Sequence, residues 1–135
     1  MEIEKKTILV AEDDTVIREL LTVMLKTAGF DLLTASDGVE AVETFKAHSD
    51  QVRLIITDIG MPRMNGLEAI VIIRQMSTSV PIMILSIWEE KEYQKIAQEN
   101  NVQNYMKKPF DVEELIRKVR EAVKNPPKPA PSASA

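Results

Sequence analysis

Acidic residues directly follow two apolar stretches of this sequence, and their type and spacing are suited to chemistry. The run 54–57 leads into Asp58, and the run 7–11 leads into the acidic triplet 12–14. A short apolar run that ends at a turn is typical of a buried strand. In open α/β sheets ligands bind outside the carboxyl ends of the strands, so we expect Asp58 and the acidic triplet at a ligand-binding edge.

Several carboxylates at one sheet edge indicate a site for a hard cation. Like charges at short distance repel, so the cluster is unfavourable unless a cation neutralises it. Oxygen ligands with room for water suit Mg²⁺ better than Ca²⁺, and the sequence therefore predicts Mg²⁺. Two of the acids also have a simpler explanation. Asp58 taken alone could be a turn residue at a strand end, and Asp14 could cap the helix that follows it, whereas Glu12 and Asp13 are not needed as caps.

Two more polar side chains are predicted at the same edge. Ser86 ends the fourth apolar run, and Lys108 follows the last one, before a proline that favours an extended backbone. Lys107 should point the other way along its strand. An aspartate can accept a phosphoryl group as an acyl phosphate, while a metal, an ammonium and a hydroxyl neutralise the phosphoryl oxygens. The sequence has no candidate Ser/His or Cys/His pair and no P-loop, so these residues favour phosphoryl transfer to Asp58.

Alternating strands and helices must position these residues. Strands are predicted at 7–11, 31–35, 53–57, 80–85 and 103–107, and helices after Asp14, after Ser36 or Asp37, after Asn65, at about 89–99 and after Asp111. Strands buried on both faces indicate a single doubly wound (βα)5 domain of the α/β class, a five-stranded parallel sheet with helices on both faces. The flavodoxin-like order 2-1-3-4-5 places the first and third strands side by side, which brings Glu12 and Asp13 next to Asp58.

Three of the helices carry specific expectations about burial. The first should turn inward its residues Ile17, Leu20, Leu21, Met24 and Ala28. The helix at 89–99 is rich in charge and should be the least anchored, because it offers a core little but Tyr93, Ile96 and Ala97. The third helix should bury Leu67, Ile70 and Ile73, which leaves Val71 and Ile72 outward.

Length and composition set the broader class. The chain has 135 residues, which suits one domain, and we expect that domain at 1–124, followed by a disordered Pro/Ala/Ser-rich tail or linker at 125–135. The net charge of −4 argues against direct nucleic-acid binding by this domain. There is no cysteine, no membrane-spanning apolar run and no signal-peptide core, so a soluble cytoplasmic domain is expected, with no membrane association.

Four motifs taken together resemble the receiver domain of two-component response regulators. They are Ile-Leu-Val-Ala-Glu-Asp-Asp at 8–14, Thr-Asp-Ile-Gly-Met-Pro-Arg-Met-Asn-Gly-Leu-Glu at 57–68, Ser86, and Tyr-Met-Lys-Lys-Pro-Phe at 105–110. Each motif alone is weakly specific, but all four in this order and spacing are strongly so. The resemblance covers residues of about 5 to 124.

The resemblance implies a mechanism and partners. Asp58 is the expected phosphoacceptor, phosphorylated by a histidine kinase or a phosphotransfer protein, and the chain is no enzyme beyond catalysing its own phosphorylation and slow dephosphorylation. Mg²⁺ is arranged by Glu12, Asp13, Asp58 and the backbone carbonyl of Gly60. Lys108 and Ser86 contact the phosphoryl group, and Tyr105 is the aromatic switch residue. The expected output face comprises the fourth helix, fifth strand and fifth helix; the effector is unknown, and a phosphorylation-dependent homodimer is left open.

The sequence also departs from the family pattern. Glu12 stands where Asp is commoner, Ile87 follows Ser86 where a small residue is usual and would crowd Asp58, Asn65 replaces a frequent Asp, and Asn101-Val102 replaces a frequent Gly-Ala. The alternative function is a phosphorylation-independent pseudo-receiver that acts as a protein-interaction module. An aspartyl-phosphate phosphatase is disfavoured because Gly60 stands where the second acid is needed. The length up to Ala135 leaves either a single-domain regulator or a fragment cut in a linker.

Overall fold

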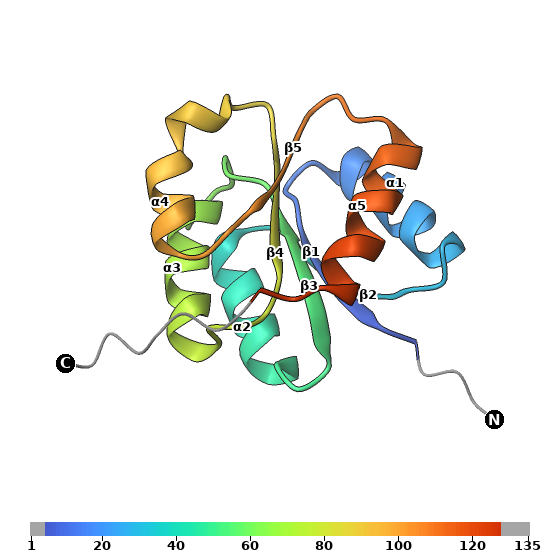
Figure 1. Cartoon of the computed structure of the whole chain (residues 1–135), viewed down its shortest axis with the longest axis horizontal. Helices are drawn as coiled ribbons and strands as arrows, with labels where there is room; N and C mark the ends of the chain where they lie inside the picture. Colours follow the sequence, from blue (N-terminus) through green and yellow to red (C-terminus); the bar gives the residue numbers. More distant parts are fainter. Residues whose placement is uncertain (1–4, 128–135) are drawn as a thin grey trace.

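Five parallel strands form the centre of the structure, a computed structural model that describes residues 5–127. The strand order is β2-β1-β3-β4-β5, as predicted (Figure 1). The strands are β1 (Thr7–Ala11), β2 (Asp31–Ala35), β3 (Val52–Thr57), β4 (Ile82–Ser86) and β5 (Asn104–Lys107). The helices are α1 (Thr15–Thr27), α2 (Gly38–His48), α3 (Gly66–Met76), the 3₁₀ turn η1 (Glu90–Glu92), α4 (Gln94–Glu99) and α5 (Val112–Lys124).

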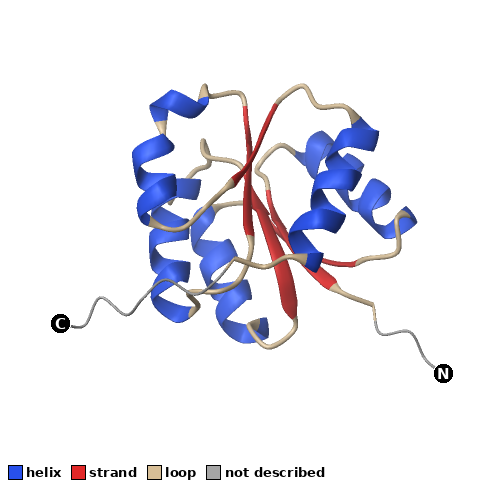
Figure 2. Ribbon diagram, in the orientation of Figure 1, coloured by secondary structure: helices blue, strands red, loops and turns tan. Residues whose placement is uncertain are grey.

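The helices form a layer on each face of the sheet. In Figure 2, α1 and α5 cover one face, while α2, α3 and α4 cover the other. Because successive side chains of a strand point to opposite faces, Ile8 and Val10 enter the core under α1 and α5, whereas Leu9 and Ala11 enter the core under α2 and α3. All of these side chains are buried, so the sheet is apolar on both faces, which makes the fold a doubly wound α/β domain as expected.

Four of the helices begin at the residues predicted to cap them. The side chains of Asp14, Asp37, Asn65 and Asp111 each accept a backbone N–H from the first turn of the helix that follows. Asn65 forms a complete capping box with Glu68. Each cap sets the residue at which its helix begins. The loop between the preceding strand and that helix therefore has a defined end at the carboxyl edge of the sheet.

Two predictions about the helices are wrong in part. The segment expected as one helix at 89–99 is the short turn η1 followed by the six-residue α4. Only Tyr93 and Ala97 of its expected apolar residues are buried, while Ile96 is exposed. In α1, Leu20 was expected in the core and is exposed, because Leu21, Met24 and Leu25 fill the space under that helix instead.

The two ends of the chain lie mostly outside the described residues. α5 ends at Lys124, and most of the expected tail at 125–135 is not described, so the domain boundary and the tail stay predictions. Among residues 5–127, none of the helices combines the length with the apolar character that crossing a bilayer takes.

Candidate functional site

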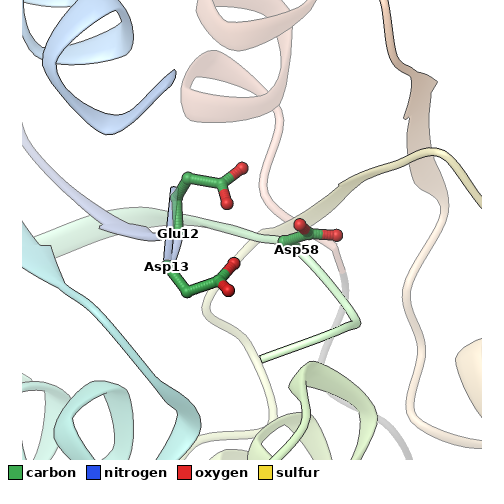
Figure 3. A group of neighbouring side chains, drawn as sticks. All are labelled: Glu12, Asp13 and Asp58. Atoms are coloured by element: carbon green, nitrogen blue, oxygen red, sulfur yellow. The ribbon is translucent and has the colours of Figure 1, made fainter. Parts of the chain in front are cut away.

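The three predicted carboxylates meet at the carboxyl edge of the sheet. Glu12 and Asp13 follow β1, and Asp58 follows the neighbouring strand β3, where Ala11 pairs with Thr57 (Figure 3). One oxygen from each carboxylate lies within 4.8 Å of the others. No other cluster of this kind occurs in the part of the chain that the structure describes. The ligand atoms are all oxygens and Asp13 is exposed, so the site suits a hard cation that keeps some of its water.

Lys108 joins two of these carboxylates. Its ammonium donates to Asp58 Oδ2 at 2.8 Å and also to Glu12 Oε1. Its side chain is only 10% exposed, and the side chains of Glu12 and Asp58 are 3% and 13% exposed. Burial alone would lower the pKa of Lys108, but its hydrogen bonds to both carboxylates and their negative charges outweigh burial and raise the pKa. Lys108 is therefore a fixed positive charge inside the acid cluster.

Glu12 is the most deeply buried acid of the cluster. Burial raises the pKa of its carboxyl group, although the hydrogen bonds from Lys108 and from the Asp14 N–H favour the charged form. Arg18, in the first turns of α1, donates from Nη1 to the Glu12 carbonyl at 2.7 Å and to the Asp13 carbonyl at 3.4 Å. No sequence pattern pointed to Arg18, because it binds backbone oxygens six and five residues earlier in the chain.

Asp58 is held by backbone groups on both sides. Its N–H donates to the Ala11 carbonyl at 3.0 Å, and its Oδ1 accepts the Ile59 N–H at 2.6 Å. Gly60 follows two residues later; it is exposed, and a Cβ placed on it would meet nothing within 4 Å. Gly60 thus lies in an exposed part of the loop, and the role of its carbonyl as a metal ligand stays a prediction.

Ser86 lies at the end of β4 and is buried. Its Oγ accepts the Trp88 N–H at 3.1 Å, and its carbonyl accepts the Lys108 N–H at 3.0 Å. A hydroxyl that accepts one hydrogen bond still has its own proton to donate. The next residue, Ile87, is 68% exposed, so its side chain is not buried among its neighbours, and its crowding of Asp58 stays a prediction.

Tyr105 lies one strand further along the sheet. Its ring packs against that of Tyr93, with centroids 5.7 Å apart and planes at 41°, and its hydroxyl donates to the Val102 carbonyl at 2.7 Å. Lys107 does not reach the carboxylates and pairs with Glu89 instead, as expected from its direction along β5. The structure therefore separates the two adjacent lysines into one inside the cluster and one on the surface.

The comparisons with known proteins decide the family. The model of the response regulator receiver domain family matches residues 8–120. The chain belongs to that family. The receiver domain is 34% identical over 128 residues to the alkaline phosphatase synthesis transcriptional regulatory protein PhoP of Bacillus subtilis, covering 95% of this chain and 52% of that protein. It is 37% identical over 113 residues to the transcriptional regulatory protein KdpE of Staphylococcus aureus, covering 84% and 48% respectively.

Solved structures agree with this assignment. The chemotaxis protein CheY4 of Vibrio cholerae superposes on the receiver domain with a TM-score of 0.81 at 27% identity, over 87% of this chain and 98% of that one. The chain spans about half the length of the two curated relatives named above. What the rest of those proteins does is therefore no guide to this chain.

Proposed function

We propose that this receiver domain accepts a phosphoryl group on Asp58 and transmits the change to a partner. The observation that carries the proposal is the set of contacts around Asp58: two further carboxylates with oxygens within 4.8 Å, and the Lys108 ammonium 2.8 Å from Oδ2. A nucleophilic carboxylate beside a fixed cation and a metal-binding cluster is the arrangement that phosphoryl transfer needs.

The proposed donor is a phosphohistidine on a histidine kinase or a phosphotransfer protein. A carboxylate oxygen of Asp58 attacks the phosphorus; the new P–O bond forms as the P–N bond breaks, and the histidine nitrogen leaves with the electron pair. The Lys108 ammonium stabilises the charge on the phosphoryl oxygens, and the Ser86 hydroxyl donates a hydrogen bond to one of them. Hydrolysis of the acyl phosphate by water would return Asp58 to its starting state.

The carboxylate cluster fits Mg²⁺. Glu12, Asp13, Asp58 and the Gly60 carbonyl would hold the ion, with Glu12 acting directly or through water. When bound, the ion would neutralise phosphoryl oxygens and allow several like charges to share the edge. Without the ion, Lys108 is the ion-pair partner of both Glu12 and Asp58 among residues 5–127.

The proposed switch runs from Ser86 to the face formed by α4, β5 and α5. The acyl phosphate carries about −1.5 to −2 charges in place of the single charge of the carboxylate, and its oxygens would draw the Ser86 hydroxyl and the Lys108 ammonium toward Asp58. Ser86 leads through Trp88 to η1, and the Lys108 backbone continues from β5, which carries Tyr105. Tyr105 would then leave its contacts with Tyr93 and Val102 and adopt a second packing arrangement. The unphosphorylated and phosphorylated forms would favour different ones of these two arrangements.

The proposal extends to the partners of the domain and to its cellular location. We expect a histidine kinase or phosphotransfer protein upstream, an effector at the α4–β5–α5 face, and a cytoplasmic location. The proposal leaves room for a homodimer that forms on phosphorylation. The receiver domain would occupy residues 1–124.

Intact-mass measurement after incubation with a small phosphodonor and Mg²⁺ tests the proposal. We expect the mass of one added phosphoryl group on the parent chain, its loss in chelator, and none on Asp58→Asn. Asparagine is nearly isosteric and keeps an acceptor for the Ile59 N–H, so the fold should persist and circular dichroism should match the parent. A phosphoryl group on Asp58→Asn would refute the assignment of Asp58. A parent chain that never gains one would instead favour the phosphorylation-independent interaction module.

A further inference from the structure

The loop that carries Asp58 and Gly60 returns to the sheet edge within a few residues. In this β3–α3 loop (residues 58–65), the Gly66 N–H that follows donates back to the Ile59 carbonyl at 2.8 Å. A Cβ on Gly66 would collide with the Asp58 carbonyl oxygen, so the loop closes tightly at its base. Gly60 directly follows Ile59, but it has no side chain to hold it, and a Cβ placed on it would meet nothing within 4 Å.

The outer part of the loop is held by the start of α2. Arg63 Nε and Nη2 each lie 2.9 Å from Asp37 Oδ2. The other Asp37 oxygen accepts the Glu40 N–H at 2.8 Å, so the same carboxylate caps α2. One residue on, the Gly38 N–H donates to the Met64 carbonyl at 3.0 Å, and a Cβ at Gly38 would strike that carbonyl. A side-chain contact and a backbone contact thus fasten the loop to α2.

Arg63 has an unfavourable backbone conformation. Its φ is +65°, in the left-handed region that residues other than glycine seldom adopt. Such a conformation persists only where surrounding contacts offset its cost. The Arg63–Asp37 ion pair supplies such a contact, because the Asp37 side chain is only 9% exposed and both guanidinium donors reach one oxygen. A glycine at position 63 would adopt the same φ without cost but would leave Asp37 without its partner.

We propose that Arg63 is a positioning residue of the site: through Asp37 it holds the β3–α3 loop in the conformation that presents the Gly60 carbonyl beside Asp58. The inference rests on the proposed function, because it concerns the Mg²⁺ site. The Arg63 side chain is 61% exposed and pairs with Asp37, which is outside the carboxylate cluster. Its effect on the site must therefore pass through the backbone between positions 60 and 63. Mg²⁺ demands near-ideal octahedral geometry, so a small displacement of one oxygen ligand weakens binding.

The decisive variant is Arg63→Gly, which separates the effect of the ion pair on overall stability from its effect on the conformation of the loop. It removes the contact with Asp37 and relieves the strain at φ +65°, so the midpoint of urea unfolding should stay close to that of the parent. Mg²⁺ affinity, measured by titration calorimetry, should nevertheless fall about tenfold, the lower end of what loss of an outer-sphere partner causes. Amide exchange of residues 60–65 in chelator should become faster. Arg63→Lys keeps one charged donor, so its Mg²⁺ affinity should lie between that of the parent and that of Arg63→Gly.

Arg117→Gln is the matched control, because Arg117 forms an exposed ion pair with Glu121 on α5, far along the chain from the loop. It should bind Mg²⁺ like the parent. Parent-like Mg²⁺ affinity and parent-like exchange in Arg63→Gly would overturn the inference. The inference would also be overturned if Arg63→Gly lost Mg²⁺ affinity together with overall stability, while amide exchange of residues 60–65 became no faster. If the parent chain itself bound no Mg²⁺, the proposed function would fail at that point, while exchange in chelator would still report whether Arg63 orders the loop.

Discussion

At the scale of single residues, Lys108 determines the balance of charge in the site. Its ammonium contacts two carboxylates that belong to different strands, and all three side chains are largely buried. Without it, Glu12 and Asp58 would be like charges in a poorly solvated place, which is costly. The lysine therefore has a structural role in the metal-free chain in addition to its proposed role toward the phosphoryl group.

Replacing Lys108 with methionine should destabilise the chain in chelator by about 3 kcal/mol, the low end for breaking a buried ion pair. Methionine keeps the apolar stem and removes the charge, so the decrease in the free energy of unfolding measures the cost of leaving two carboxylates without their counter-charge. Addition of Mg²⁺ should recover part of it, because the ion supplies the missing positive charge. Urea unfolding with and without Mg²⁺ measures both effects. Lys107→Met, which removes an exposed pair with Glu89, should change stability far less than Lys108→Met in either condition, because exposed ion pairs contribute little; equal effects of the two variants would contradict this account.

Tyr93 provides a test of burial that does not depend on the site. Burial raises the pKa of its hydroxyl to about 12, with the nearby Glu90 adding to the effect. The neutral phenol is thus favoured in the folded state. Its contribution to stability is complete below the unfolded pKa of about 10 and is lost as the pH rises through the folded pKa.

Phenolate absorbance in the folded chain should therefore show ionisation above the ordinary range for both tyrosines, since the pKa of Tyr105 is also raised by burial. Tyr93→Phe should remove the later phase. The free energy of unfolding should fall less in that variant than in the parent between about pH 10 and pH 12. Ionisation of both phenols near pH 10 would show that Tyr93 is not packed as described.

At the scale of elements, what could be predicted from the sequence follows from how each element is stabilised. The strands and the acids at their ends were predicted because buried runs and capping residues leave local signals. The split of the fourth helix was not, because Glu, Lys and Gln favour helix locally while tertiary contacts decide its extent. The wrong placement of Leu20 has a similar origin, because α1 is apolar on more than one face. Contacts such as Arg18 with the Glu12 carbonyl or Arg63 with Asp37 join distant positions and leave no local pattern.

The C-terminal end of the short helix α4 is hydrogen-bonded to α3. Arg74 of α3 donates from Nε to the Asn100 carbonyl at 2.6 Å, from Nη2 to the Asn101 carbonyl at 3.3 Å and from Nη1 to the Ser77 carbonyl at 3.1 Å. Burial lowers the pKa of Arg74 to about 10, but it stays charged at neutral pH. At the other end, η1 is preceded by Glu89, whose contact with Lys107 is exposed. The N-terminal end of α4 is held instead by the buried ring of Tyr93, which packs against Tyr105.

Arg74→Met should cost about 2 kcal/mol of stability, because half-buried carbonyl groups lose their donor. Amide exchange of residues 94–102 should become faster, while that of α5 should not change. Arg53→Met is a suitable control, since Arg53 is exposed and donates to the single carbonyl of Asp50. Unchanged exchange across α4 in Arg74→Met would mean that the helix is anchored by the burial of Tyr93 and Ala97 alone.

At the scale of the whole molecule, the exposed apolar side chains are unevenly distributed. Val16, Leu20 and Val23 of α1 are 74%, 47% and 65% exposed, and their spacing places them on one stripe of the helix. On α3, Val71 and Met76 are each 40% exposed, which partly bears out the expectation that Val71 faces outward. Single exposed apolar residues are ordinary, but a contiguous stripe marks a contact surface. The α1 stripe begins two residues after Asp14, at the same edge as Asp58.

A protein that delivers a phosphoryl group to Asp58 must cover that edge, so the α1 stripe should form part of its contact. Leu20→Lys combined with Val23→Lys should lower the rate of transfer from a histidine-phosphorylated protein about tenfold or more, as expected for loss of central apolar contacts. The rate with a small phosphodonor should stay as in the parent, because that donor needs no surface. Stability should change little, since both side chains are already exposed. Val71→Lys on α3 is the control and should leave both rates unchanged. Equal slowing with the two donors would place the effect in the site itself, and a loss of protein-donor transfer only in Val71→Lys would move the contact surface to α3.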